Sequence, residues 1–326
     1  MNATALARAR NCLLGLAAGD ALGMPAQTLS RGAIARHYGR ITGFVAPFDG
    51  HPVSHGLSAG QVTDDTEQTL LLSRRLLRDP DGFDAQGWAQ DLLDWEAGIR
   101  AKGLADLLGP SSKAAIAALL DGVPPEETGV NGTTNGAAMR IAPVGLSVAP
   151  EVEPLVARVV ETCRVTHNTG EAIAAASAVA MTVSCGVAGS GFDAALPRAL
   201  DAARHGQRVG RPRGDPDMAG RILRAVELAR DGEQALVSGI GTSVASRESV
   251  ACAFGLLSMG LPLWETLCVA ANIGDDTDTI GAITGAMGGA LGMTLPGDAV
   301  AALRAANALD LDGHAADLLA LRKVAA

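Results

Sequence analysis

Aromatic residues are scarce in this chain of 326 residues: Phe, Trp and Tyr together make up 3%. Hydrophobic residues nevertheless account for 48%, so a large core must be filled by Ala, Leu, Val, Ile and Met. A core built mainly from small and straight-chain residues favours helices over strands. The composition therefore predicts an α-helical protein.

Positive charge is also in deficit. The formal net charge is −9, and no basic stripe runs along the chain. This balance argues against nucleic acid or another polyanion as a partner held by bulk charge. A phosphate-bearing ligand would need a local site made from backbone N–H groups and a few side chains.

Cysteine is sparse, and no metal or disulfide pattern connects the five that occur. An odd number without a CxxC pair is typical of reduced cysteines, which predicts a cytoplasmic protein. We find no stretch long and apolar enough to span a membrane and expect no membrane partner. Arg8 and Arg10 precede a short apolar run that ends at Asp20 without a convincing cleavage site, so we interpret this segment as an amphipathic first helix.

Strand signals are weak, and the best of them, residues 41–48, is equally consistent with an extended loop. Residues 205–220 are rich in Gly, Pro and charge, and suit a linker or a surface loop. Apolar helices continue on both sides without a shift in composition, so we expect one all-α domain over residues 1–326. Helical periodicity predicts helices at residues 3–20, 64–78, 84–98, 111–121, 151–165, 169–187, 192–205, 216–230, 247–259, 263–271, 278–292, 297–308 and 313–323.

Glycine is concentrated in one of these predicted helices. Residues 280–292 contain five glycines among small and apolar residues. Each glycine in a helix costs about 1 kcal/mol relative to alanine. A helix that tolerates several of them is expected to pack very closely against a neighbouring backbone.

A first acidic cluster, "TDDT", precedes an apolar stretch. Thr63 fits a helix N-cap, with Asp64, Asp65 and Glu67 in the first turn, where the helix dipole favours negative charge. This structural interpretation explains the first cluster adequately on its own.

A second cluster is harder to explain by helix capping. Asp275, Asp276 and Asp278 lie directly before the glycine-rich helix, which is expected to be buried. Buried unpaired carboxylates are costly, and like-charged neighbours raise the pKa of each. Mg²⁺ and Mn²⁺ would remove that cost, because they prefer the oxygen ligands that both clusters offer. Two aspartates from each cluster would balance two divalent ions, which predicts a binuclear centre able to activate water.

Two further features are ambiguous alone. Residues 131–145 form a polar, glycine-containing loop before an apolar segment, and N–H groups at such a helix start bind anions. Taken alone, the loop is better explained as an ordinary loop capped by Thr134 or Asn135. A lone histidine such as His167 is usually a surface or capping residue, and the alternative is a donor to a phosphate or ribose hydroxyl.

Taken in order, these stretches resemble the ADP-ribosylglycohydrolase family, which includes the enzyme that reactivates dinitrogenase reductase, ADP-ribosyl-acceptor hydrolases and crystallin-like relatives. The resemblance runs through "GLAAGDALGMP", "TDDT", "TNGAAMRIAPVG", "THNTGEA", "SVASRESVACAFGLL" and "GDDTDTIGAITGAMGGALG". It implies an all-α, many-helix orthogonal bundle with two Mg²⁺ or Mn²⁺ ions in a cleft. It also implies a glycosidase that hydrolyses the bond at the ribose C1″ carbon of ADP-ribose.

The resemblance also implies site residues, position by position. The implied metal ligands are Thr63, Asp64, Asp65, Asp276, Asp278 and Thr279. The "TNGAA" loop matches the family's diphosphate and distal-ribose cradle, and the implied substrate contacts are Asn135, Gly136, Ala137 and His167. The implied partner is an ADP-ribosylated protein or a small ADP-ribosyl or ribosyl compound.

The sequence departs from the family pattern at two positions. Asp275 replaces the second glycine of Gly-Gly-Asp-Thr-Asp-Thr and places an extra acid beside the ligands. This carboxylate would either contact the metal ligands from outside the metal site or bind a water molecule. Gln27 replaces a glutamate that the family often has shortly after "GDALG". An amide cannot act as a base near neutral pH, but it can accept a hydrogen bond or ligate through its carbonyl oxygen. A compatible mechanism uses metal-activated water, with Asp64 or Asp65 as proton acceptor and Gln27 in an orienting role.

Three hypotheses follow. The first is a hydrolase of ADP-ribosylated protein or of a small ADP-ribosyl compound. The second keeps the metals but cleaves another N-ribosyl compound, such as a nucleoside or nucleotide, with Gln27 marking the branch. The third is an ADP-ribose-binding relative with weak or no catalysis. Retention of all six ligand positions argues against the third, whereas Gln27 argues for keeping it.

Overall fold

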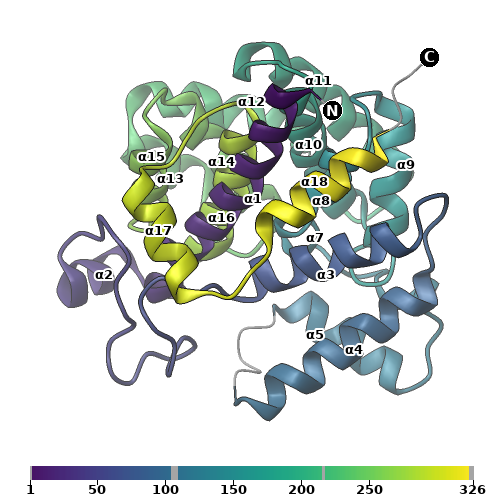
Figure 1. The fold of residues 1–326 in the computed structure, drawn as a ribbon, viewed down its shortest axis with the longest axis horizontal. Coiled ribbons are helices and arrows are strands. Elements are labelled where there is room, and N and C mark those ends of the chain that lie inside the picture. The colour runs from purple at the N-terminus through teal and green to yellow at the C-terminus, as the bar shows by residue number, and fades with distance from the viewer. Residues whose placement is uncertain (1, 104–108, 215–216, 323–326) are drawn as a thin grey trace.

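The fold was analysed in a computed structural model that describes residues 2–103, 109–214 and 217–322 (Figure 1). Within these ranges the chain is built from α-helices and short 3-10 helices, and its only β contacts are isolated bridges. The prediction of an all-α fold is confirmed. The helices are α1 Ala3–Gly23, η1 Met24–Ala26, α2 Arg31–Tyr38, α3 Asp64–Arg78, α4 Ala85–Ala101, α5 Pro110–Leu120, α6 Pro125–Thr128, α7 Gly136–Met139, α8 Ala142–Ser147, α9 Val152–Cys163, α10 Gly170–Val187, α11 Phe192–Val209, α12 Met218–Leu228, η3 Ala229–Asp231, α13 Glu233–Ile240, α14 Ser246–Ser258, α15 Leu263–Ala270, α16 Thr277–Ala290, α17 Gly297–Ala306 and α18 Leu311–Leu321.

Periodicity located the long helices to within a few residues of their observed ends. It missed α2, α6, α7, α8 and α13, none of which is longer than eight residues. A helix this short covers few turns and displays little of a repeating apolar face, although the equally short α15 was predicted. Two predicted boundaries, at residues 216 and 323, lie outside the described ranges.

The two ambiguous segments are irregular where they are described. Residues 41–48 form a loop without strand pairing. In the segment 205–220, α11 continues to Val209, and Arg211 then pairs with the chain beside Thr169, donating its N–H to the Asn168 carbonyl at 2.9 Å. This half of the segment packs against the body of the protein as a surface loop. The expectation of a single domain over the whole chain stays a prediction.

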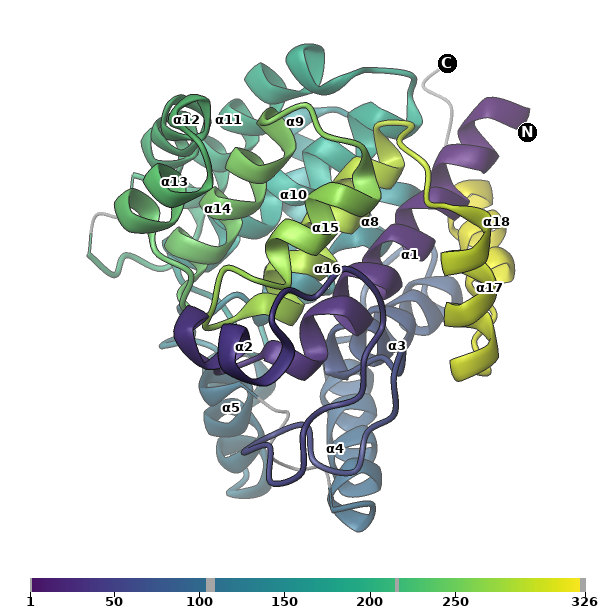
Figure 2. The ribbon, with the colours of Figure 1, turned by 90° about the vertical axis from the view of Figure 1, so that its left-hand side faces the viewer.

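The α1–α16 pair forms the centre of the fold, and the two helices lie side by side in both views (Figures 1 and 2). Their contact is made backbone to backbone through glycines. A Cβ added to Gly19 would lie 2.0 Å from the Gly281 carbonyl oxygen, and one added to Gly15 would lie 2.2 Å from that of Gly285. The predicted close approach of the glycine-rich helix is confirmed, and its partner is α1.

The first helix is therefore not amphipathic, contrary to the prediction. Every residue from Cys12 to Gly23 is buried, because α1 is enclosed by α16 and its neighbours rather than lying on the surface. The sequence suggested solvent exposure through the charged residues before Cys12, and these occupy only the first turns.

The expectation about membrane spans also needs correction. In the described part of the chain one helix, Gly170–Val187, is long and apolar enough to cross a membrane by length and composition. All of it is buried inside the fold, which is typical of a core helix. The Ala-rich sequence raises its mean hydropathy without large side chains.

The main hydrophobic cluster extends from Ala9 on α1 to Leu319 on α18. A smaller cluster centred on Ile99 and Ile116 joins α4 to α5. These two helices lie below the α1–α16 pair in both views (Figures 1 and 2). The starts of α3, α5, α7 and α16 contribute to one cavity between these parts of the fold.

Candidate active site

The first acidic motif begins α3 and is buried. Thr63 occupies the N-cap position as predicted, but its side chain makes no capping hydrogen bond. The cap is Asp20 of α1, whose carboxylate accepts the backbone N–H of Thr63 at 3.0 Å and that of Thr66 at 3.1 Å. Both threonine hydroxyls also donate to Asp20. The side-chain cap is therefore supplied by Asp20 and not by Thr63, whereas Asp64, Asp65 and Glu67 lie in the first turn of α3 as predicted.

Sequence reasoning missed Asp20. It is fully buried, and burial raises the pKa of Asp20 to about 6, while the hydrogen bonds from Thr66 and Thr63 oppose that rise. One signal was available, since Asp20 is the single charged residue in the apolar run of residues 12–26. A lone acid in a buried helix needs several donors, and α3 supplies them.

The second acidic motif begins α16. Asp276 occupies the N-cap position, its N–H donates to the Thr242 carbonyl at 3.0 Å, and its carboxylate accepts a hydrogen bond from Nδ2 of Asn135. Asp278 follows in the first turn and is buried. The two motifs therefore begin two helices. Asn135 contacts the second of them directly, and it belongs to residues 134–138, the loop predicted to bind the substrate and here named the substrate loop.

Asp275 is turned away from this cluster. Its φ of 57° lies in the left-handed region, which explains why glycine suits the position. Its N–H donates to the Leu29 carbonyl at 2.8 Å, and its carboxylate accepts the Thr242 hydroxyl at 2.9 Å. The extra acid joins loops beside the site.

The two motifs converge on Asp65. Its Oδ2 atom accepts the hydroxyl of Thr279 at 3.4 Å and lies 3.3 Å from the hydroxyl oxygen of Thr63, whose proton is donated to Asp20 at 2.8 Å. The other oxygen, Oδ1, is buried without a hydrogen-bond partner, and the same is true of Oδ1 of Asp278. Two buried carboxylate oxygens thus lack a donor where the helix starts meet.

Burial and mutual repulsion govern the ionisation of these carboxyls. Burial raises the pKa of Asp64, Asp65 and Asp278 well above the ordinary value, and the neighbouring carboxylates raise it further. Burial raises the pKa of Asp276 to about 6, although the hydrogen bond from Asn135 opposes the rise. Such a group of acids is stable in the charged form only with compensating positive charge.

The donor set fits divalent cations. Among the described residues, no group of three or more Asp, Glu, His or Cys side chains is arranged so that it could hold a metal ion as the side chains stand. The two unpartnered oxygens on Asp65 and Asp278 nevertheless require either protons or cations, and the available ligands are carboxylates and hydroxyls. Hard cations such as Mg²⁺ and Mn²⁺ prefer this chemistry, whereas the site offers no thiolate or imidazole for zinc.

A cavity of about 160 Å³ connects the acidic residues to the substrate loop. Its wall includes Asp64, Asp276, Asp278 and Thr279 together with Thr134, Asn135 and Gly136. Gln27 and Val53 also border it. Ala137 is fully buried and lies behind this wall.

A second cavity, of about 350 Å³, is lined by residues of α3, α9 and the loop after α8, among them Asp79, Glu151 and Arg158. Arg158 already donates to the backbone carbonyl of Gly82 and forms an ion pair with Glu161. This larger space contains no buried carboxylate cluster and no glycine loop. The chemistry therefore favours the smaller cavity.

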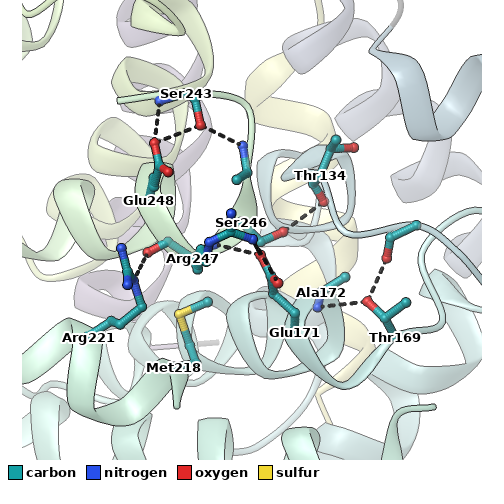
Figure 3. Close-up of polar contacts among 12 residues, drawn as sticks. Thr134, Thr169, Glu171, Ala172, Met218, Arg221, Ser243, Ser246, Arg247 and Glu248 are labelled. Atoms are coloured by element: carbon teal, nitrogen blue, oxygen red, sulfur yellow. Dashed lines mark hydrogen bonds and ion pairs between the residues drawn. The ribbon is translucent and has the colours of Figure 1, made fainter. Parts of the chain in front are cut away.

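The substrate loop is held rigidly from behind (Figure 3). Ser246 at the start of α14 donates its hydroxyl to the Thr134 carbonyl at 2.7 Å, and its N–H donates to the Thr133 carbonyl at 3.1 Å. Beside it, Arg247 pairs with the buried Glu171 of α10 at 3.3 Å. The "SVASRES" segment thus anchors the loop, a role that its sequence did not indicate.

His167 lies behind the loop. It is fully buried, and its Nε2 atom is 3.0 Å from the hydroxyl oxygen of Thr134. A Cβ added to Gly136 would lie 2.9 Å from Cε1 of His167, so glycine is required here by the imidazole ring. Burial, followed by the charge of Arg140, lowers the pKa of His167 well below the ordinary value. His167 is thus a neutral support for the loop.

The side chain of Gln27 is fixed by Ser54. Nε2 of Gln27 donates to the Ser54 hydroxyl oxygen at 2.9 Å, and that hydroxyl in turn donates to the Met24 carbonyl at 2.8 Å. Because the Ser54 hydroxyl proton is donated to Met24, the Ser54 oxygen can only accept from Gln27, and the Gln27 amide must therefore present its N–H group to Ser54. The carbonyl oxygen of Gln27 is therefore the part left for the cavity, and it presents an acceptor as a glutamate would.

Comparison with known proteins agrees with the fold and the motifs. Residues 1–325 match the sequence model of the ADP-ribosylglycohydrolase family. The chain is 39% identical over 290 residues to an uncharacterized protein of Archaeoglobus fulgidus, covering 88% of each chain. It is also 30% identical over 164 residues to the ADP-ribosyl-[dinitrogen reductase] glycohydrolase of Rhodospirillum rubrum, covering 49% of this chain and 51% of that one.

A solved structure is similar over the whole fold. An ADP-ribosylglycohydrolase-related protein complex superimposes with a TM-score of 0.72 at 25% identity, covering 97% of this chain and 98% of that chain. The all-α bundle with paired acidic helix starts is of the glycohydrolase class. The chain belongs to the ADP-ribosylglycohydrolase family, and membership supports a hydrolase of ADP-ribose linkages.

Proposed function

We propose that this protein is a metal-dependent hydrolase that cleaves the glycosidic bond at the ribose C1″ carbon of an ADP-ribosylated substrate. One observation carries the proposal: Asp65 and Asp278 each have a buried carboxylate oxygen without a partner, and Asp278 lines a cavity that the Thr134–Gly136 loop also lines. A cation-binding cluster and an anion-binding loop on one cavity suit a ligand with both a ribose and a diphosphate.

Six residues would hold two Mg²⁺ or Mn²⁺ ions, and all but Thr63 and Asp65 line the cavity. They are Thr63, Asp64, Asp65, Asp276, Asp278 and Thr279. When bound, such ions neutralise the carboxylates, bind hydroxyl oxygens and lower the pKa of water. Thr279 of α16 donates to Oδ2 of Asp65 on α3 at 3.4 Å, which links the two helix starts that carry the proposed ligands.

Asp64 is the better of the two proposed proton acceptors. It is one of the residues that line the cavity, whereas Asp65 is not. Gln27 would orient ribose or water through its carbonyl oxygen, because its N–H group is engaged by Ser54.

The substrate loop would bind the diphosphate. Asn135 and Gly136 face the cavity, with Asn135 held by Asp276 and by the Ser249 hydroxyl at 3.0 Å. Ala137 and His167 would act from behind, since both are fully buried. The loop supplies local donors that an acidic protein otherwise lacks.

A second candidate function is hydrolysis of an N-ribosyl bond in a nucleoside or nucleotide. The observation that favours it is the cavity volume of about 160 Å³, below the range of about 300–1,000 Å³ typical of ligand pockets. Gln27 in place of a glutamate also favours this second function. The third candidate function is ADP-ribose binding with weak or no catalysis.

The buried, unpaired cysteines support placing the protein in the reducing cytoplasm. The net charge of −9 supports an ADP-ribosyl compound or protein as partner rather than nucleic acid.

One set of assays separates the three functions. Turnover is measured on ADP-ribosylated protein, ADP-ribosyl-arginine and a nucleoside panel, with Mg²⁺, with Mn²⁺ and after chelation. The proposal expects metal-dependent release of ADP-ribose. Metal-dependent turnover of nucleosides alone would favour the second function. ADP-ribose binding without turnover on any substrate would favour the third.

A further inference from the structure

A buried arginine lies between the acidic cluster and the substrate loop. Arg140 is 1% exposed, and its guanidinium lies 5.5 Å from the centre of the Trp88 ring. It donates from Nη1 to Oε1 of Gln68 at 2.6 Å and from Nη2 to the hydroxyl oxygen of Thr166. Both acceptors are neutral. A buried charge held by neutral groups is costly, so the fold keeps it for a reason other than an ion pair.

The first branch from Arg140 leads to the acidic cluster. A guanidinium can only donate, so the carbonyl oxygen of Gln68 must face Arg140. The amide nitrogen then faces the other way, where Nε2 lies 3.3 Å from Oδ2 of Asp64. Gln68 is fully buried, and rotation of its amide would set two donors against each other. Arg140 therefore fixes an N–H group on Asp64.

The second branch leads to the substrate loop. The Thr166 hydroxyl accepts from Arg140, so its own proton is available for Nδ1 of His167, which lies 2.7 Å away. A neutral imidazole that accepts at Nδ1 carries its proton on Nε2. That N–H donates to the Thr134 hydroxyl oxygen at 3.0 Å. The Thr134 proton is then left for an acceptor in the cavity that Thr134 lines.

We propose that Arg140 is a positioning residue that sets the direction of both hydrogen-bond branches, Gln68 to Asp64 and Thr166 to His167 to Thr134. One guanidinium thus orients a carboxylate of the cation cluster and a hydroxyl donor of the anion loop. The assignment of Thr134 as a donor to the diphosphate rests on the proposed function. The tautomer of His167 does not, because it is a property of the protein alone.

The tautomer is tested by ¹⁵N NMR of histidine-labelled protein without substrate, with His167→Gln used to assign the signals. Wild type should show the proton on Nε2 and none on Nδ1. Thr166→Val removes the hydroxyl at nearly constant volume and should change this pattern, whereas Thr166→Ser should restore it. A wild-type proton on Nδ1, or an unchanged pattern in a folded Thr166→Val protein, would overturn the second branch even if the enzyme had no known substrate.

Binding measurements then separate the branches. Thr166→Val should weaken ADP-ribose binding by about 2- to 12-fold, the range for one lost hydrogen bond, and leave Mn²⁺ binding unchanged. Gln68→Met should weaken Mn²⁺ binding by a similar factor and leave the His167 tautomer unchanged. Arg140→Met should do both, and unfolding curves check that each variant is folded. Arg140 does not act through two branches if Gln68→Met and Thr166→Val both change the same measurement. The same conclusion holds if Gln68→Met leaves Mn²⁺ binding unchanged and Thr166→Val leaves ADP-ribose binding unchanged.

If wild type shows the expected His167 tautomer but does not bind ADP-ribose, the proposed function is rejected. The hydrogen-bond branch that sets the tautomer still stands in that case.

Discussion

Asp20 on the first helix accepts both the backbone N–H and the hydroxyl of Thr66, the former at 3.1 Å. The same carboxylate accepts the N–H and hydroxyl of Thr63. The central helix α1 thus fixes the start of α3, where two of the proposed cation ligands follow. Stability and cation binding are linked through this one residue.

Asp20→Asn should therefore destabilise the fold by about 2–4 kcal/mol, because an amide nitrogen would face donors that now share a buried carboxylate. Denaturant unfolding measures the loss, and Mg²⁺ titration should show weaker binding in the folded variant. The matched control is Asp298→Asn, since Asp298 is an exposed acid in the first turn of α17. An unfolding midpoint equal to that of wild type would contradict the capping role.

Composition and periodicity sufficed for the helical class and for most long helices, because these properties are local. They could not show that α1 faces α16. Gly281 and Gly285 signalled close backbone packing, but the partner glycines lie more than 250 residues earlier in the chain. The acidic motifs were recognisable from spacing, whereas Asp20 and Arg140 act through contacts that exist only after folding.

The glycine contact between α1 and α16 gives a second prediction. Gly281→Ala should destabilise the protein by more than about 2 kcal/mol, since the new Cβ would lie 2.4 Å from the Gly19 carbonyl oxygen. Gly98→Ala is the matched control, because Gly98 lies on exposed α4 with no atom near its added Cβ. That control should be neutral or gain about 0.5–1 kcal/mol from helix propensity. Equal effects of the two substitutions on the unfolding midpoint would refute the backbone contact.

Cation binding should stabilise the fold in a pH-dependent manner. Burial raises the pKa of Asp64, Asp65 and Asp278, so the metal-free folded state binds more protons than the unfolded state. Its stability therefore falls as the pH rises above the ordinary carboxyl pKa and through the raised values. Mg²⁺ must displace these protons. The increase in melting temperature caused by Mg²⁺ should therefore grow from pH 5.5 to pH 8.

The size of this increase follows from mass action. Cation at about 100 times its Kd should add about 2.7 kcal/mol per site. Asp276→Ala should remove the binding of at least one cation, and with it that cation's share of the increase in melting temperature. The same substitution should abolish hydrolysis. Asp193→Ala, which removes an exposed acid from the first turn of α11, should leave both unchanged. A chelated wild type with full activity would contradict the binuclear site, as would a zinc ion held by His and Cys.

Gly136 provides a test of the substrate loop. Gly136→Val should weaken ADP-ribose binding, because the added side chain would push against Cε1 of His167 and displace the loop from the cavity. The nearby Gly132 cannot serve as the control position, because a Cβ added there would lie 2.1 Å from the Thr166 carbonyl oxygen. The control is therefore a glycine in an open turn. Gly122→Asn, at a positive φ with open space, should leave binding unchanged. Calorimetry with ADP-ribose that showed equal Kd for Gly136→Val and wild type would remove the loop from the site.

Gln27 decides between the two proposed reactions. If its carbonyl oxygen only orients ribose or water, Gln27→Ala should reduce kcat/KM modestly on ADP-ribosyl-arginine. General acid–base groups supply about 10²- to 10⁴-fold, and a neutral amide cannot supply that contribution. A loss beyond about 10⁴-fold would contradict the orienting role.

Gln27→Glu gives the sharper result, and Ser54 explains why. The Ser54 hydroxyl now donates to the Met24 carbonyl and accepts from Nε2 of Gln27. With a carboxylate at position 27 that hydroxyl can rotate and donate to it instead, so the side chain keeps its place and adds a proton acceptor. Turnover of ADP-ribosyl-arginine should then rise, and Ser54→Ala in the same background should cancel part of the gain.

If Gln27 instead recognises a nucleoside by donating a hydrogen bond, Gln27→Glu should lower kcat/KM on that nucleoside, because a carboxylate cannot donate. Steady-state kinetics of wild type, Gln27→Ala and Gln27→Glu on both substrate classes distinguish these outcomes. No change in either class would remove Gln27 from the reaction altogether.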